Sequence, residues 1–133
     1  MELKPGRSFE RDVLHLLALQ GWAIQPEQLL LHKKVDGLAE KLGDFGETIR
    51  LAVECKDLAH AMTQQEVSEV YANYLPLLQK DCVDRVLLVT RHPVTPSAKT
   101  FTKGAKAFLQ ITEIELLNSL LDFSAYLRAM IDQ

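Results

Sequence analysis

Residues 49–56 read Ile-Arg-Leu-Ala-Val-Glu-Cys-Lys, and apolar side chains occupy every odd position of this stretch. A period of two is typical of a β-strand with one face on the core, and it places Arg50, Glu54 and Lys56 together on the other face. Charges inside such a strand cost free energy unless another group pairs with them or uses them. The stretch therefore predicts both a strand and a place to look for chemistry.

A turn-forming segment, Gly43-Asp44-Phe45-Gly46-Glu47, precedes this strand and predicts a hairpin with a five-residue loop. Pairing the strands immediately outside the loop places Asp36 directly across from Glu54. The same register places Glu40 across from Arg50, which carries the opposite charge. We therefore expect the two acids and the lysine that ends the strand to lie on one face of the hairpin.

The rest of the chain predicts helices and strands around this hairpin. Helical spacing of apolar residues and two capping boxes predict helices at about 7–20, 63–80, 97–106, 113–121 and from 124 to the end. Further strand-like segments are Trp22–Ile24 and Leu29–His32, separated by a turn-prone Gln-Pro-Glu, and then Arg85–Thr90 and Phe108–Ile111. The order α-β-β-β-α-β-α-β-α predicts an α/β fold with a mixed β-sheet flanked by helices.

Length and composition indicate one domain with an ordinary core, since the chain has 133 residues of which 47% are hydrophobic and 25% are charged. No apolar run approaches the ~20 residues needed to cross a bilayer, so no membrane partner is expected. Cys55 and Cys82 have no metal-ligand spacing, which indicates reduced thiols and a cytoplasmic location. The net charge of −3 gives no sign of the basic stripe that many nucleic-acid binders carry.

Asp36 and Glu54, one strand pair apart, would repel each other unless a cation lies between them. Carboxylate oxygens favour Mg²⁺ or Mn²⁺, which also accept phosphate oxygens as ligands, and the backbone carbonyl of Cys55 could be a further ligand. Lys56 points to the same side, where it could activate a water molecule or stabilise charge on a phosphate. Together these groups meet the needs of phosphodiester hydrolysis. The alternative interpretation is a solvated strand face with a salt bridge.

Three motifs of this sequence resemble a known family of nucleases. They are Val35-Asp36-Gly37, Leu51-Ala52-Val53-Glu54-Cys55-Lys56-Asp57, and the strand Arg85–Thr90 followed by Thr95-Pro96-Ser97-Ala98-Lys99. Together they resemble the PD-(D/E)xK phosphodiesterases of the restriction-endonuclease-like fold, closest to the Mrr-type (type IV restriction) branch. The resemblance spans about residues 7–121 and implies a three-layer fold. Val35 stands where the namesake proline would be, and Glu54 replaces the glutamine usual in Mrr enzymes.

The resemblance also implies roles for individual residues. Asp36 and Glu54 would be metal ligands, and Lys56 would be the catalytic lysine. Members often carry a glutamate on the first helix that completes the acidic site, and Glu10 is the matching position, with an ordinary polar helix residue as the alternative. Some relatives place a site glutamine at the start of the helix after the triplet, which favours Gln65, although a first-turn residue is often simply exposed.

Lys33 and Lys34 lie just before Asp36, where the phosphates of a bound nucleic acid would lie, and solvated surface charge is the alternative. We therefore interpret residues 1–133 as a single nuclease-like domain, which could be an N-terminal module excised from a larger protein. The expected activity is Mg²⁺- or Mn²⁺-dependent endonucleolytic hydrolysis of DNA, in a restriction or antiphage defence protein. The low positive charge favours a fused NTPase or recognition domain, or a homodimer, as a source of affinity.

Two other functions are open at this point. A catalytically silent relative would serve as a binding or oligomerisation module, although the intact acid and lysine pattern argues against it. A junction resolvase or an RNA-directed nuclease would use the same residues on a different substrate.

Overall fold

A five-stranded mixed sheet forms the centre of the protein, in a computed structural model that describes residues 5–105 and 108–113. The strands are β1 (Ala23–Leu30), β2 (Lys33–Leu42), β3 (Thr48–Lys56), β4 (Arg85–Thr90) and β5 (Leu109–Glu113), and they follow this order across the sheet. Strands β1, β2 and β3 are antiparallel neighbours, whereas β4 and β5 run parallel to β3. The predicted α/β class with a mixed sheet is confirmed.

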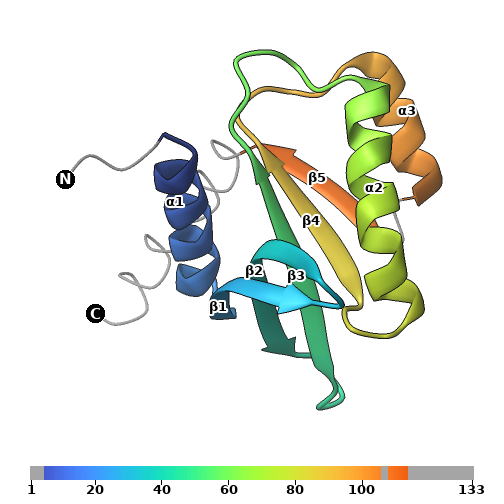
Figure 1. Ribbon diagram of the computed structural model, residues 1–133. Helices are drawn as coiled ribbons and strands as arrows, with labels where there is room; N and C mark the ends of the chain where they lie inside the picture. Colours follow the sequence, from blue (N-terminus) through green and yellow to red (C-terminus); the bar gives the residue numbers. More distant parts are fainter. Residues whose placement is uncertain (1–4, 106–107, 114–133) are drawn as a thin grey trace.

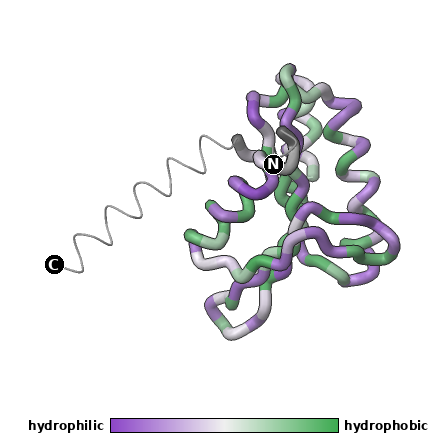
Figure 2. The backbone as a smooth tube through the Cα atoms, turned by 60° about the vertical axis from the view of Figure 1, so that its left-hand side comes forward, coloured by the Kyte–Doolittle hydropathy of each residue, from purple (hydrophilic) through white to green (hydrophobic). Residues whose placement is uncertain are grey.

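Helices cover both faces of this sheet. Helix α1 (Pro5–Leu19) lies on one face, and α2 (Gln64–Gln79) and α3 (Pro96–Ala105) lie on the other (Figure 1). Hydrophobic and hydrophilic residues alternate along the helices, as expected when one side of each helix packs on the sheet (Figure 2). No helix in the described part of the chain is long and apolar enough to span a membrane. The helices predicted at 113–121 and from 124 onward lie outside the described residues, apart from Glu113, which ends β5.

The central strand β3 differs from its sequence pattern in one respect. The alternation predicted one buried and one charged face, but every residue from Leu51 to Cys55 is buried. Leu51 and Val53 belong to the core cluster beneath α1, and Ala52 belongs to the cluster beneath α2 and α3. Enclosure between helical layers and beside a parallel strand accounts for this burial. As a result Glu54 is a buried carboxylate, only 8% exposed.

The hairpin of β2 and β3 has the predicted register. Leu42 pairs with Thr48, and the loop is closed by the Gly43 N–H, which donates to the Glu47 carbonyl at 2.7 Å. The paired ladder ends at Gly37 and Val53, so the next position along it is that of Asp36 and Glu54. The predicted site thus lies where the backbone pairing of the hairpin stops.

The edge strand β1 corrects the expectation of two short strands separated by a turn. A single strand runs from Ala23 to Leu30, with Pro26 paired opposite Gly37. Because β1 is at the edge of the sheet, the missing N–H of Pro26 need not face a partner strand. Leu31 and His32, predicted to end the strand, instead form the turn to β2 with φ values of 47° and 67°. Positive φ at both positions is typical of a two-residue type I′ hairpin turn.

Candidate functional site

Three predicted site residues meet at the end of the β2–β3 ladder. The backbone N–H of Cys55 donates to Asp36 Oδ2 at 2.8 Å, which holds the Asp36 side chain against β3. Lys56 Nζ lies 3.5 Å from Glu54 Oε1. The hairpin register thus brings Asp36 to the backbone of β3 at Cys55, between Glu54 and Lys56. Their roles in catalysis stay predictions.

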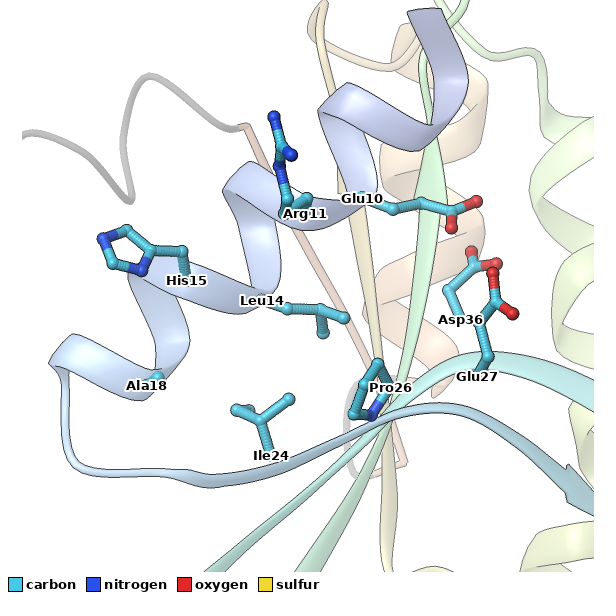
Figure 3. Close-up of a pocket in the computed structure, with 9 residues that line it drawn as sticks. All are labelled: Glu10, Arg11, Leu14, His15, Ala18, Ile24, Pro26, Glu27 and Asp36. Atoms are coloured by element: carbon cyan, nitrogen blue, oxygen red, sulfur yellow. The ribbon is translucent and has the colours of Figure 1, made fainter. Parts of the chain in front are cut away.

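Glu10 on α1 joins this group, as the resemblance implied. Its carboxylate points from the helix toward Asp36 (Figure 3). The pKa of Asp36 is raised from 3.8 to about 6, first by burial and then by the charge of Glu10 and a hydrogen bond with it. The hydrogen bond from the Cys55 N–H and the charge of Lys56 oppose this increase. The first helix thus brings a second carboxyl group into direct interaction with Asp36.

Negative charge is concentrated at this end of the sheet. The pKa of the Cys55 thiol lies above its usual range because the side chain is buried and because Asp36, Glu10 and Glu54 surround it with negative charge. The same thiol is therefore within electrostatic reach of all three carboxyl groups. Such an excess of carboxylates disfavours their joint ionisation unless a cation is near.

The donors suit a hard divalent cation in their chemistry, because carboxylate oxygens are the ligands that Mg²⁺ and Mn²⁺ prefer. Within residues 5–105 and 108–113, however, there is no group of three or more His, Cys, Asp or Glu side chains arranged to hold a metal ion. Both oxygens of Glu54 have protein partners instead: Oε1 contacts Lys56, and Oε2 accepts a hydrogen bond from Tyr74. The concentration of charge, and not a preformed ligand cage, is thus the feature that indicates a cation.

Tyr74 on α2 is the partner of Glu54 that the sequence did not reveal. Its side chain is 0% exposed and belongs to the core cluster beneath α2 and α3. Burial and the charge of Glu54 raise the pKa of Tyr74 far above its usual range, so the hydroxyl stays protonated and donates. The available signal was general: a buried tyrosine hydroxyl needs a hydrogen-bond partner.

The two predicted phosphate-binding lysines differ in position. Lys33 Nζ lies 5.0 Å from the centre of the Tyr74 ring, which brings this ammonium group next to the site. Lys34 is exposed on β2. Neighbouring residues of a strand point to opposite faces, so we expect only Lys33 to share a face with Tyr74.

Two further predicted groups have no observed link to the carboxylates. Gln65 is exposed, and its amide donates to Glu69 at 3.4 Å; within the described chain no contact joins it to Asp36 or Glu54. Of the backbone groups of Cys55, the N–H is the one that contacts Asp36. The carbonyl of Cys55 as a metal ligand, and Gln65 as a catalytic residue, therefore stay predictions.

An open cavity of about 780 Å³ adjoins the carboxylates between α1 and β1. Its lining residues are Glu10, Arg11, Leu14, His15, Ala18, Ile24, Pro26, Glu27 and Asp36 (Figure 3). Because Glu10 and Asp36 lie at one end of this cavity, the acidic group can be reached by a ligand from outside.

Comparison with known proteins identifies the family. The model of a restriction endonuclease family, Mrr_cat, matches residues 3–121. The chain belongs to this family. The match confirms the resemblance carried by the Asp36, Glu54 and Lys56 motifs. Among the curated proteins, none matches the chain.

Solved structures show that this Mrr_cat domain has the restriction-endonuclease-like fold. One is the protein of unknown function AF1548, with a TM-score of 0.65 and 18% identity over 79% of this chain and 57% of the other. The DNA modification-dependent restriction endonuclease AspBHI has a TM-score of 0.59 and 15% identity, covering 86% of this chain and 34% of that one. The MspJI restriction endonuclease, solved with a 27-mer oligonucleotide, has a TM-score of 0.57 and 13% identity, covering 85% and 27%. The chain thus spans little more than half of AF1548, and about a third or less of the two restriction enzymes.

The raised pKa of Asp36 predicts a pH-dependent stability for the metal-free Mrr_cat domain. The carboxyl holds its proton up to about pH 6 in the folded state, but has its ordinary pKa of 3.8 in the unfolded chain. Between pH 3.8 and about 6 the folded state therefore binds more protons than the unfolded chain. As the pH rises through this range, the contribution of Asp36 to the free energy of unfolding falls. We expect Asp36→Asn to raise the free energy of unfolding by about 1 kcal/mol near neutral pH, allowing for solvent screening, and to have little effect near pH 4.

Urea unfolding in EDTA at the two pH values measures this difference. The asparagine keeps a side-chain oxygen that can accept from the Cys55 N–H, so the substitution removes mainly the charge. An equal change in the free energy of unfolding at both pH values would show that ionisation of Asp36 is not the cause.

Proposed function

We propose that this domain is an endonuclease that hydrolyses phosphodiester bonds of DNA with Mg²⁺ or Mn²⁺ as cofactor. The observation that carries the proposal is the meeting of Asp36, Glu10 and Glu54 with Lys56 at the end of β3, in a member of a restriction endonuclease family. DNA as the substrate is supported by two proteins of the same fold, the DNA modification-dependent restriction endonuclease AspBHI and the MspJI restriction endonuclease solved with a 27-mer oligonucleotide.

The residues divide into acidic ligands and a cationic group. Asp36, Glu54 and Glu10 would hold the cation, with the carbonyl of Cys55 as a further ligand. When bound, the cation supplies positive charge at the scissile phosphate and favours ionisation of an attacking water. Lys56 projects from the same strand end as Glu54, and its ammonium group would donate to a phosphate oxygen as negative charge develops there.

Overall charge does not favour DNA binding, because 18 acidic residues outnumber 15 Lys and Arg residues and the net charge is −3. We expect Lys33 and Lys34 to contact phosphates beside the site, and Gln65 to approach the nucleic acid from the start of α2. Phosphate contacts dominate the affinity of most DNA-binding proteins. A fused NTPase or recognition domain, or a homodimer, would supply the rest in a cytoplasmic restriction or antiphage defence protein.

Metal titration tests the cation site separately from catalysis. We expect saturating Mn²⁺ to stabilise the wild type by about 2.7 kcal/mol when the free metal is a hundredfold above its Kd, seen as a higher melting temperature. Asp36→Ala should lose this response because it removes a central ligand. Asp44→Ala, which removes an exposed acid of the hairpin loop, is the matched control and should respond as the wild type does. An unchanged response in Asp36→Ala would contradict the site.

One observation favours a second candidate, a catalytically silent binding or oligomerisation module. In the described residues both Glu54 oxygens have protein partners, and no group of three or more His, Cys, Asp or Glu side chains is arranged to hold a metal ion. A domain that neither responds to Mn²⁺ nor nicks plasmid DNA would support this candidate. Cleavage of a four-way junction or of single-stranded RNA in preference to plasmid would indicate a resolvase or an RNA-directed nuclease.

A further inference from the structure

We infer that Tyr74 is a positioning residue that fixes the Glu54 carboxylate for the cation, an inference that rests on the proposed metal-dependent function. Tyr74 comes from α2, outside the hairpin that carries Asp36, Glu54 and Lys56. Its hydroxyl donates to Glu54 Oε2, and no motif that pointed to the site includes it. The hydroxyl therefore acts on the site through Glu54.

The contacts of Glu54 divide between its two oxygens. Oε2 is held by Tyr74 from the helical layer, and Oε1 lies 3.5 Å from Lys56 Nζ on the same strand. A glutamate has several rotatable bonds, and ordering it when a cation binds costs conformational entropy. A carboxylate that is already held in one orientation binds a metal more tightly, which is why hydrogen-bond partners of metal ligands matter for affinity.

Tyr74 also bridges the two strands of the hairpin. Its hydroxyl reaches Glu54 on β3, while its ring face lies 5.0 Å from the ammonium group of Lys33 on β2. The last backbone pair between these strands is Gly37 with Val53, so pairing no longer fixes their separation at the site. A rigid aromatic side chain that contacts both strands there can hold the two halves of the site in place.

A purely structural role is the competing explanation, because any buried tyrosine and carboxyl group need hydrogen-bond partners. The two explanations differ in what Tyr74→Phe changes. The phenylalanine keeps the ring, and with it the packing and the Lys33 contact, and loses only the hydroxyl. A structural role predicts lower stability with unchanged metal affinity, whereas a positioning role predicts weaker metal binding.

Calorimetric titration of the metal-free domain with Mn²⁺ separates these outcomes. We expect Tyr74→Phe to raise the Kd for Mn²⁺ by ~10-fold or more, in the range known for partners of metal ligands. DNA cleavage should return toward the wild-type rate at high Mn²⁺, since Lys56 is untouched. Tyr71→Phe is the matched control, because Tyr71 is on the same helix and its ring packs edge-on against Phe101 with centroids 6.0 Å apart. It should bind Mn²⁺ as the wild type does.

A second pair of variants tests whether the Tyr74 hydroxyl acts on the cation through Glu54. Glu54→Ala combined with Tyr74→Phe removes both polar partners, which costs less than leaving one unpaired. Its Kd for Mn²⁺ should equal that of Glu54→Ala alone, because the hydroxyl that Tyr74→Phe removes acts only through Glu54. A further loss in the double variant would overturn the inference, as would wild-type Mn²⁺ affinity in folded Tyr74→Phe. If the wild type itself binds no Mn²⁺, the proposed function fails and the inference falls with it.

Discussion

Replacing Lys56 by alanine should slow cleavage of supercoiled plasmid DNA by about 10³-fold, the loss expected when a group that stabilises transition-state charge is removed. Lys56 ends β3 with its ammonium group 3.5 Å from Glu54, and its side chain is 38% exposed. A partly exposed lysine contributes little to stability through an ion pair, so the variant should fold normally. The rate of nicking at saturating Mg²⁺, measured by gel electrophoresis, gives the comparison.

The matched control for this experiment is Lys80→Ala, which removes an exposed lysine at the C-terminal end of α2. It changes the net charge by the same amount as Lys56→Ala but should leave the nicking rate unchanged. Lys56→Ala should still be stabilised by Mn²⁺, because the acidic ligands remain. Nicking by Lys56→Ala at the wild-type rate would remove Lys56 from the reaction.

Replacing Asp84 by alanine should lower the free energy of unfolding by about 2 kcal/mol, because it removes charge-assisted hydrogen bonds that are partly buried. Asp84 Oδ2 accepts from the backbone N–H of Arg50 at 2.7 Å and from its Nε at 3.2 Å, and Oδ1 accepts from the guanidinium at 3.1 Å. These contacts join the beginning of β3 to the segment that leads into β4. Urea denaturation at neutral pH measures the loss.

Glu40→Ala provides the control for Asp84→Ala. Glu40 is directly opposite Arg50 in the strand register, yet the guanidinium pairs with Asp81 and Asp84. We therefore expect Glu40→Ala to change the free energy of unfolding by less than about 0.5 kcal/mol. If Glu40→Ala were as destabilising as Asp84→Ala, the assignment of the Arg50 partner would be wrong.

The local parts of the fold could be predicted from the sequence. The turn at Gly43-Asp44-Phe45-Gly46-Glu47 fixed the register of the hairpin, and the register in turn placed Asp36 at the level of Glu54. These features depend on residues close together in the chain. Features that depend on distant segments were predicted less well. Pro26 lies within a strand because β1 is at the sheet edge, a position that local patterns do not specify.

The candidate site also divides into residues that local sequence patterns predict and residues that distant segments bring to it. Alternation along β3 was enough to bring Glu54 and Lys56 together, whereas Glu10 on the first helix was suggested only by the resemblance to a family. Tyr74 could be predicted as a core residue from the apolar stripe of its helix. Its hydrogen bond to Glu54 could not, because it depends on how α2 is placed on the sheet.

The most direct test of the proposed nuclease is to incubate the purified domain with supercoiled plasmid in Mg²⁺, in Mn²⁺ and in EDTA. We expect nicked or linear DNA with either metal, none in EDTA, and none from Asp36→Ala under any of the three conditions. The absence of cleavage by folded wild-type protein at high concentration, with plasmid, single-stranded RNA and a four-way junction alike, would contradict a nuclease built on Asp36, Glu54 and Lys56.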